Sequence, residues 1–141
     1  PAAIGASFGS PGRTVCVFTG DGGYQMSIQE LGTIMEQQIP VKMIMLNNNY
    51  LGNVRQWQDM FFDRRQSFTR MLNPCYERIA EAYGIGYRRI SDRHELADAV
   101  GDMLSAKGPY LLECAIKEDD NVLPMTPPGK TVDEMMLDVN I

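Results

Sequence analysis

The segment between Thr14 and Asn49 constrains the fold of this chain more than any other. An uninterrupted apolar run at 14–18 leads into Gly20-Asp21-Gly22-Gly23, and a second apolar run at 41–46 ends in three asparagines. A helical pattern lies between the two runs. Strands that are joined by a helical crossover pair in parallel, so their carboxyl ends meet at one edge of the sheet. The segment therefore predicts a parallel α/β unit in which the acid and the asparagines come together.

Other patterns along the chain predict the remaining elements. Helices are expected at 1–10, from Ser27 to about 38, at 51–61, from Pro74 to 83, and after Ser91, with further strands at 87–90 and 110–116. Three of the helix starts rest on local capping patterns: Ser27 with Glu30, Asn73 before Pro74, and Ser91. The alternation of strands and helices predicts a mostly parallel α/β sheet with helices on both faces.

Composition and charge exclude several classes of protein. The net charge of −5 argues against a general nucleic-acid binder, and no run of about 18 apolar residues predicts a membrane span. The odd count of three cysteines, without a signal peptide, predicts a cytoplasmic location. Cys16 and Cys114 fall inside apolar strand patterns and are expected to be buried. The chain begins at Pro1, within a helical pattern and without a methionine, which indicates a piece of a longer protein.

The two strand ends together indicate a site for a magnesium diphosphate. Gly20-Asp21-Gly22-Gly23 alone is a common turn former, and three asparagines alone are also typical of a turn. Here both follow apolar strands that flank one helix. The glycines permit a close approach of the backbone, and the start of the helix offers N–H groups to an anion. Asp21 and Asn48 supply oxygen ligands of the kind that Mg²⁺ prefers, with phosphate oxygens and water completing its shell.

These residues also carry a resemblance to a known family. Gly20-Asp21-Gly22, the intervening helix and Asn47-Asn48 resemble the thiamine-diphosphate-binding motif, in which GDG is followed by NN. The segments IQELGTI, PVKMIMLNNNYLG, VRQWQDMFF and NVLPMTPPGKTVDEMML resemble the large, catalytic subunit of acetolactate (acetohydroxyacid) synthase. The resemblance covers essentially the whole chain. It implies the thiamine-diphosphate-binding fold, as the C-terminal domain of a three-domain enzyme.

The resemblance implies roles for individual residues. Asp21 and Asn48 match the side-chain ligands of magnesium, and Tyr50 matches its backbone-carbonyl ligand. Gly22 and Gly23 match positions whose main-chain N–H groups lie at the diphosphate. The full set expected to contact the cofactor is Gly20, Asp21, Gly22, Gly23, Asn48, Tyr50, Leu51, Gly52 and Asn53.

Two further positions bear on the substrate side of the site. Trp57 matches a tryptophan that lines the substrate approach, and its alternative role is packing of an amphipathic helix. Asn53 stands where the family typically has methionine, so a polar amide replaces part of an apolar wall that faces the cofactor region. Either a lineage variant or an altered substrate pocket would account for Asn53.

The resemblance implies a thiamine-diphosphate-dependent transferase. In the family, pyruvate is decarboxylated and its two-carbon unit is joined to a second 2-oxo acid, pyruvate or 2-oxobutyrate. The products, acetolactate or acetohydroxybutyrate, lead to valine, leucine and isoleucine. The glutamate that activates the cofactor lies on another domain of a partner subunit in the family, so no catalytic residue is expected in this chain. FAD on another domain, a homo-oligomer and a regulatory small subunit are further implications.

Two alternatives stay open from the sequence. The domain could serve another thiamine-diphosphate-dependent decarboxylase or oxidase of 2-oxo acids, or it could be a non-catalytic module that binds a phospho-ligand. The segment 117–141 bears on this choice. We expect residues 1–116 to form the cofactor-binding domain and 117–141 to be a tail that covers the active site or packs at an interface. A simple binding module has little need of such a tail.

Overall fold

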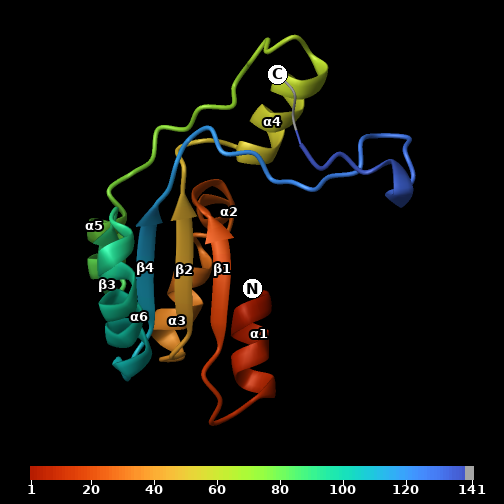
Figure 1. Cartoon of the computed structure of the whole chain (residues 1–141). Helices are drawn as coiled ribbons and strands as arrows, with labels where there is room; N and C mark the ends of the chain where they lie inside the picture. Colours follow the sequence, from red (N-terminus) through yellow and green to blue (C-terminus); the bar gives the residue numbers. More distant parts are fainter. Residues whose placement is uncertain (139–141) are drawn as a thin grey trace. The chain divides into compact units, whose positions relative to one another are not determined.

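The computed structural model describes residues 1–138 and contains one parallel sheet (Figure 1). The described strands are β1 (Cys16–Gly20), β2 (Lys42–Asn47), β3 (Gly86–Ile90) and β4 (Tyr110–Ala115). They lie in the order β1-β2-β4-β3, and every pair of neighbours is parallel. The predicted parallel α/β class and the four predicted strand positions are therefore confirmed.

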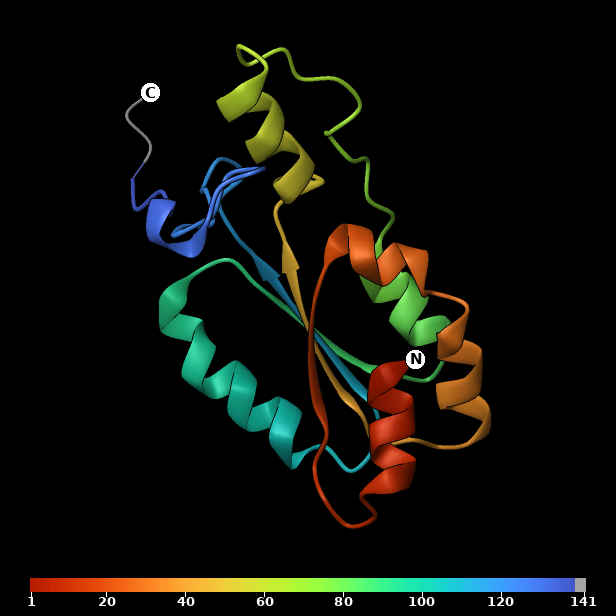
Figure 2. The same ribbon diagram turned by 90° about the vertical axis from the view of Figure 1, so that its right-hand side faces the viewer.

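Helices cover both faces of this sheet (Figure 2). The described α-helices are α1 (Ala2–Gly9), α2 (Asp21–Met26), α3 (Glu30–Glu36), α4 (Gly52–Phe61), α5 (Tyr76–Ala82) and α6 (Leu96–Ser105). Helices α1, α2, α3 and α5 bury one face around Met45 and Leu111, while α6 buries the other face around Leu112. None of the described helices has the length and apolar character needed to cross a membrane.

The chain divides into two compact units. The sheet unit consists of residues 1–49 and 72–116, and the second unit consists of residues 50–71 together with the chain from Lys117 onward. In the second unit, Arg55 of α4 donates hydrogen bonds to the main-chain carbonyls of Glu118 and Asp120. Gln56 pairs with both the N–H and the carbonyl of Val122, at 2.8 and 3.0 Å. Neighbouring side chains of α4 thus hold the backbone of the C-terminal segment.

Several local predictions are wrong, each for an identifiable reason. Cys16 is exposed, because β1 is an edge strand and alternate residues project on a side where no described helix covers them. Ser27 does not cap a helix, since α2 already begins at Asp21 and Ser27 ends it. Asp92, rather than Ser91, accepts the capping bond of the short 3₁₀ helix before α6. Asn73 lies outside α5, and its side chain donates a hydrogen bond to Asp21 instead of capping the helix.

Candidate functional site

The polar ends of β1 and β2 lie at the same edge of the sheet. Gly20 pairs with Leu46 in the parallel register, so the residues that follow each strand emerge side by side. Asp21 follows β1 directly, and Asn48 follows β2. This confirms the predicted placement at the carboxyl edge, where ligands of open α/β sheets bind.

Asp21 is almost completely removed from solvent, with 1% of its surface exposed. A carboxylate in such a place needs a partner, because burial of an uncompensated charge is strongly unfavourable. The Nδ2 group of Asn73 supplies it by donating a 2.6 Å hydrogen bond to Asp21 Oδ2. Asn73 lies 52 residues further along the chain, in the segment that precedes α5. The long-range partner of the acid is thus an amide that local patterns assign to a helix cap.

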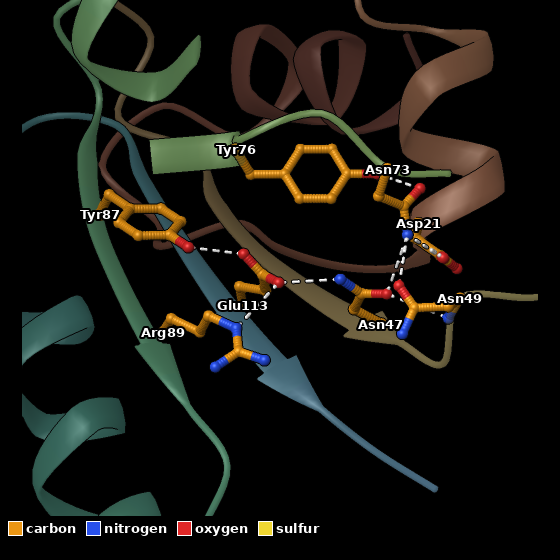
Figure 3. Close-up of polar contacts among 8 residues, drawn as sticks. All are labelled: Asp21, Asn47, Asn49, Asn73, Tyr76, Tyr87, Arg89 and Glu113. Carbon is orange, nitrogen blue, oxygen red and sulfur yellow. Dashed lines mark hydrogen bonds and ion pairs between the residues drawn. The ribbon is translucent and has the colours of Figure 1, made fainter. Parts of the chain in front are cut away.

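Three oxygens converge on the Asn73 amide nitrogen (Figure 3). Asp21 Oδ2 lies 2.6 Å from it, and the Oδ1 atoms of Asn47 and Asn49 each lie 3.1 Å from it. A neutral amide has only two N–H hydrogens for these three acceptors. One carboxylate and two amide oxygens around a single electropositive group form a hard, all-oxygen donor set. That set fits the requirements of Mg²⁺ held together with a diphosphate.

The loop after β2 is shaped by its own asparagines. Asn47 Oδ1 accepts a hydrogen bond from the Asn49 N–H at 3.1 Å, and Asn49 adopts a positive φ of 57°. Asparagine tolerates this left-handed conformation better than most residues. Asn48, partly buried, stands between these two in the chain. The structure thus brings Asp21 together with both neighbours of Asn48, while a metal ion shared by Asp21 and Asn48 themselves stays a prediction.

The glycines after β1 differ in how closely they are packed. A Cβ atom added to Gly23 would lie 3.1 Å from Thr19 Oγ1, which is tighter than most real contacts, whereas one added to Gly20 would lie 3.9 Å from the Leu46 carbonyl. Gly22 is buried in the first turn of α2. Between Gly20 and Gly23, a side chain is therefore less easily accommodated at Gly23.

The remaining predicted residues belong to the second unit. Tyr50, Leu51, Gly52 and Asn53 lead into α4 and through its first turn. Asn53 and Trp57 line the same surface hollow on that helix, together with Val54, Gln58 and Phe62. Trp57 packs edge-on against Phe61 with ring centroids 5.6 Å apart, yet 37% of it is exposed. Its packing role is therefore only partial.

A buried carboxylate on β4, Glu113, also belongs to the polar cluster of the sheet unit, and the local sequence patterns did not identify it. Its Oε1 accepts a 2.8 Å hydrogen bond from Asn47 Nδ2, and its Oε2 accepts one of 2.5 Å from the Tyr87 hydroxyl. Arg89 Nε lies 3.3 Å from Oε1. A single acid inside the otherwise apolar strand YLLECAI was the available signal.

The fold and this edge define a class of protein, the thiamine-diphosphate-binding domains. The family model described as "Thiamine pyrophosphate enzyme, C-terminal TPP binding domain" matches residues 1–114. The chain therefore belongs to this family.

Individual relatives narrow the comparison. The "Acetolactate synthase isozyme 2 large subunit" of Escherichia coli (strain K12) is 43% identical over 96% of this chain, which is 25% of that protein. The "Acetolactate synthase, mitochondrial" of Schizosaccharomyces pombe is 39% identical over 97% of this chain and 20% of its own length. Among solved structures, the thiamine diphosphate-dependent 4-hydroxybenzoylformate decarboxylase of Rhodococcus jostii RHA1 matches with a TM-score of 0.77. Its identity is 28%, over 85% of this chain and 23% of that one. This chain thus spans about a quarter or less of the length of these relatives.

Replacement of Asn73 by Asp should make the stability of the sheet unit depend on pH. A second carboxylate would then face Asp21, and two such groups at hydrogen-bond distance cannot both stay ionised without a large cost. We expect the free energy of unfolding to fall by roughly 2 kcal/mol near neutral pH. Near about pH 5 the folded pair binds a proton that the unfolded chain binds less readily, so stability should recover.

Urea denaturation of Asn73→Asp at both pH values measures this effect. Asn53→Asp, the same change at an exposed position, is the control and should show little dependence on pH. An Asn73→Asp variant as stable as the parent at neutral pH would contradict the convergence of oxygens on Asn73.

Buried tyrosines should make the protein lose stability in alkali. Burial raises the pKa of the Tyr76 phenol to about 12, and burial also raises the pKa values of Tyr24 and Tyr87. Unfolded tyrosines ionise near pH 10, so the unfolded state binds fewer protons above that pH. The free energy of unfolding should therefore fall between about pH 10 and 12, by up to about 1.4 kcal/mol per pH unit for each such tyrosine.

Urea midpoints measured from about pH 9, below the ionisation of unfolded tyrosines, to about pH 11, above it, test the effect. Tyr76→Phe removes one ionising group, so its stability should decline less steeply with pH than that of the parent. Identical slopes for the two proteins would count against a buried, protonated Tyr76.

Proposed function

We propose that this chain is the cofactor-binding domain of an acetolactate synthase large subunit. The observation that carries the proposal is the 43% identity to the Escherichia coli isozyme 2 large subunit across 96% of this chain. The solved decarboxylase matches the same fold at 28% identity. The proposed reaction is the decarboxylation of pyruvate and the transfer of its two-carbon unit to pyruvate or 2-oxobutyrate, as the first common step toward the branched-chain amino acids.

The proposed magnesium site uses Asp21 and Asn48 as side-chain ligands and the carbonyl of Tyr50 as a main-chain ligand. Support for Asp21 comes from its burial and from the converging amide oxygens of Asn47 and Asn49. In this proposal, a single carboxylate leaves positive charge on the metal ion for the diphosphate to neutralise. In this proposal, Asn73 orients the Asp21 carboxylate through its 2.6 Å hydrogen bond to Oδ2.

The other predicted residues receive binding roles in the same proposal. The main-chain N–H groups of Gly22 and Gly23 bind the diphosphate, and Gly20 allows the backbone to approach it. Leu51, Gly52 and Asn53 lie along the cofactor, and Trp57 lines the substrate approach. Thiamine diphosphate, when bound, supplies the electron sink that 2-oxo-acid chemistry needs. The residues of this chain bind and orient it, and none of them is proposed to transfer a proton.

The proposal also covers a further cofactor, partner subunits and the location in the cell. We propose that FAD, if used, binds on another domain of a longer enzyme, which forms a homo-oligomer and takes a regulatory small subunit. The segment from Lys117 onward is proposed to cover the active site or to pack at an interface. The cytoplasmic location stays a prediction, because the relatives include proteins titled mitochondrial and chloroplastic. A 2-oxo-acid decarboxylase is the alternative that the solved structure favours, and product analysis of the native protein with pyruvate separates the two.

Substitution of Asp21 by Ala should abolish magnesium-dependent binding of thiamine diphosphate. The substitution removes the one carboxylate of the proposed site, and loss of a direct ligand exceeds the roughly 10–100-fold effect of an outer-shell change. Isothermal titration calorimetry with and without MgCl₂ measures it. Asp63→Ala, at a highly exposed carboxylate, is the matched control and should bind like the parent. Unchanged affinity in a folded Asp21→Ala protein would refute the assignment of the metal site.

The 141-residue chain alone should form no acetolactate from pyruvate. In the family, the glutamate that activates the cofactor belongs to another domain of a partner subunit. Without that group, proton transfer at the cofactor lacks its acid–base partner. The purified chain with pyruvate, MgCl₂ and thiamine diphosphate should therefore match a control that contains no protein. Sustained turnover by the chain alone would show that the acid–base group lies within it.

A further inference from the structure

We infer that Glu113 is a positioning residue of the proposed magnesium site, acting through Asn47 and Asn73. This inference rests on the proposed function, because it names a residue that supports the same site. Glu113 lies within β4, is only 4% exposed, and is surrounded by donors from two neighbouring strands (Figure 3). A continuous series of hydrogen bonds joins it to Asp21.

The first step is the orientation of the Asn47 amide. An ionised carboxylate only accepts hydrogen bonds, so Asn47 must turn its Nδ2 group toward Glu113, at 2.8 Å. Its Oδ1 then faces the opposite way. There it accepts from the Asn49 N–H and from Asn73 Nδ2, both at 3.1 Å. Glu113, together with the Asn49 N–H, therefore favours the orientation in which Asn47 presents an oxygen, and not an NH₂ group, to the site.

The second step fixes Asn73 and with it Asp21. Because Asn47 presents an oxygen, Asn73 can direct its Nδ2 group to both Asn47 and Asp21. The Oδ1 of Asn73 faces away from the site, where it accepts from Gln25 Nε2 at 2.7 Å and from the Tyr76 hydroxyl at 2.9 Å. Each amide in the series thus has one orientation in which its oxygen meets donors and its nitrogen meets acceptors, with the two Asn73 hydrogens shared among three oxygens. The directions are set by the two groups that only accept, Glu113 and Asp21, and by the Asn49 N–H, which only donates.

The ion pair of Glu113 with Arg89 compensates its burial less well than the hydrogen bond from Asn47 does. Arg89 is the only cation within ion-pair distance of Glu113 among residues 1–138, yet its side chain is 54% exposed and its Nε lies 3.3 Å away. Such a half-exposed pair contributes little by itself. The Asn47 bond is the fully buried contact, and it is the one that leads to the site. Outer partners of this kind orient the direct ligands of a metal ion.

The experiment compares metal affinity with stability in the native protein that carries this chain. Glu113→Gln keeps the size of the side chain but no longer forces Asn47 to donate. Tyr87→Phe is the matched control, since it removes a hydrogen bond from the far oxygen of Glu113 and leaves the Asn47 bond in place. The readout is the Mn²⁺ concentration for half-saturation in the presence of thiamine diphosphate, from electron paramagnetic resonance, with thermal unfolding of each variant alongside.

We expect Glu113→Gln to raise this Mn²⁺ concentration about tenfold, while Tyr87→Phe leaves it near the parental value. The double variant Asn47→Asp/Glu113→Gln should recover the parental value, because a carboxylate at position 47 only accepts hydrogen bonds and so orients Asn73 directly. An unchanged Mn²⁺ concentration for Glu113→Gln, or equal shifts for both single variants, would overturn the inference. If Glu113→Gln does not fold, a folded double variant with weakened Mn²⁺ binding overturns it equally.

The same titration separates this inference from the proposed function. Loss of Mn²⁺ binding in Asp21→Ala with no effect of Glu113→Gln leaves the proposed site standing and removes only the role of Glu113. Unchanged Mn²⁺ binding in a folded Asp21→Ala protein removes the site itself.

Discussion

The burial of the Asp21 carboxylate is the constraint on which the rest of the sheet edge depends. A charge that is 1% exposed needs a donor, and no cation among residues 1–138 forms an ion pair with it. The donor comes from Asn73, so the chain before α5 must pass close to the end of β1. Gln25 and Tyr76 hold the other end of the same amide. One buried charge therefore decides how α2, the loop after β2 and the start of α5 meet.

Features that depend on patterns of neighbouring residues were predictable from the sequence, and features that depend on contacts distant in the sequence were not. The four strands were predictable because apolar runs bounded by turns report burial over several residues. The helix caps at Ser27, Asn73 and Ser91 were not, since a capping pattern is a local preference that tertiary contacts override. Asn73 bonds to Asp21, 52 positions away, and local sequence patterns do not extend over such a separation. The edge position of β1, which exposes Cys16, likewise depends on strand order and not on composition.

Within the second unit, adjacent residues of α4 carry different tasks. Arg55 and Gln56 are buried and bond to main-chain atoms of the C-terminal segment. Trp57, the next residue, lies in a surface hollow together with Asn53. Helical spacing explains the division, because consecutive residues project about 100° apart around the axis. Because Arg55 and Gln56 bond to main-chain atoms, these contacts do not require particular side chains in the segment from Lys117 onward. The run VRQWQ therefore combines residues that hold this segment with a tryptophan that lines a surface hollow.

The chemistry of the proposed site links its metal ion to its cofactor. Among the described residues, no three acids, histidines or cysteines gather at one point, and Asp21 is the one charged ligand in the proposed site. A magnesium ion held by one carboxylate and neutral oxygens lacks the negative charge that a tight site needs. The diphosphate supplies that charge, so each ligand raises the affinity for the other by the same factor. The Asn73 amide also donates a hydrogen bond to the Asp21 carboxylate, which helps to compensate its burial. A weak site that becomes tight only with its cofactor is the behaviour that this arrangement of charges favours.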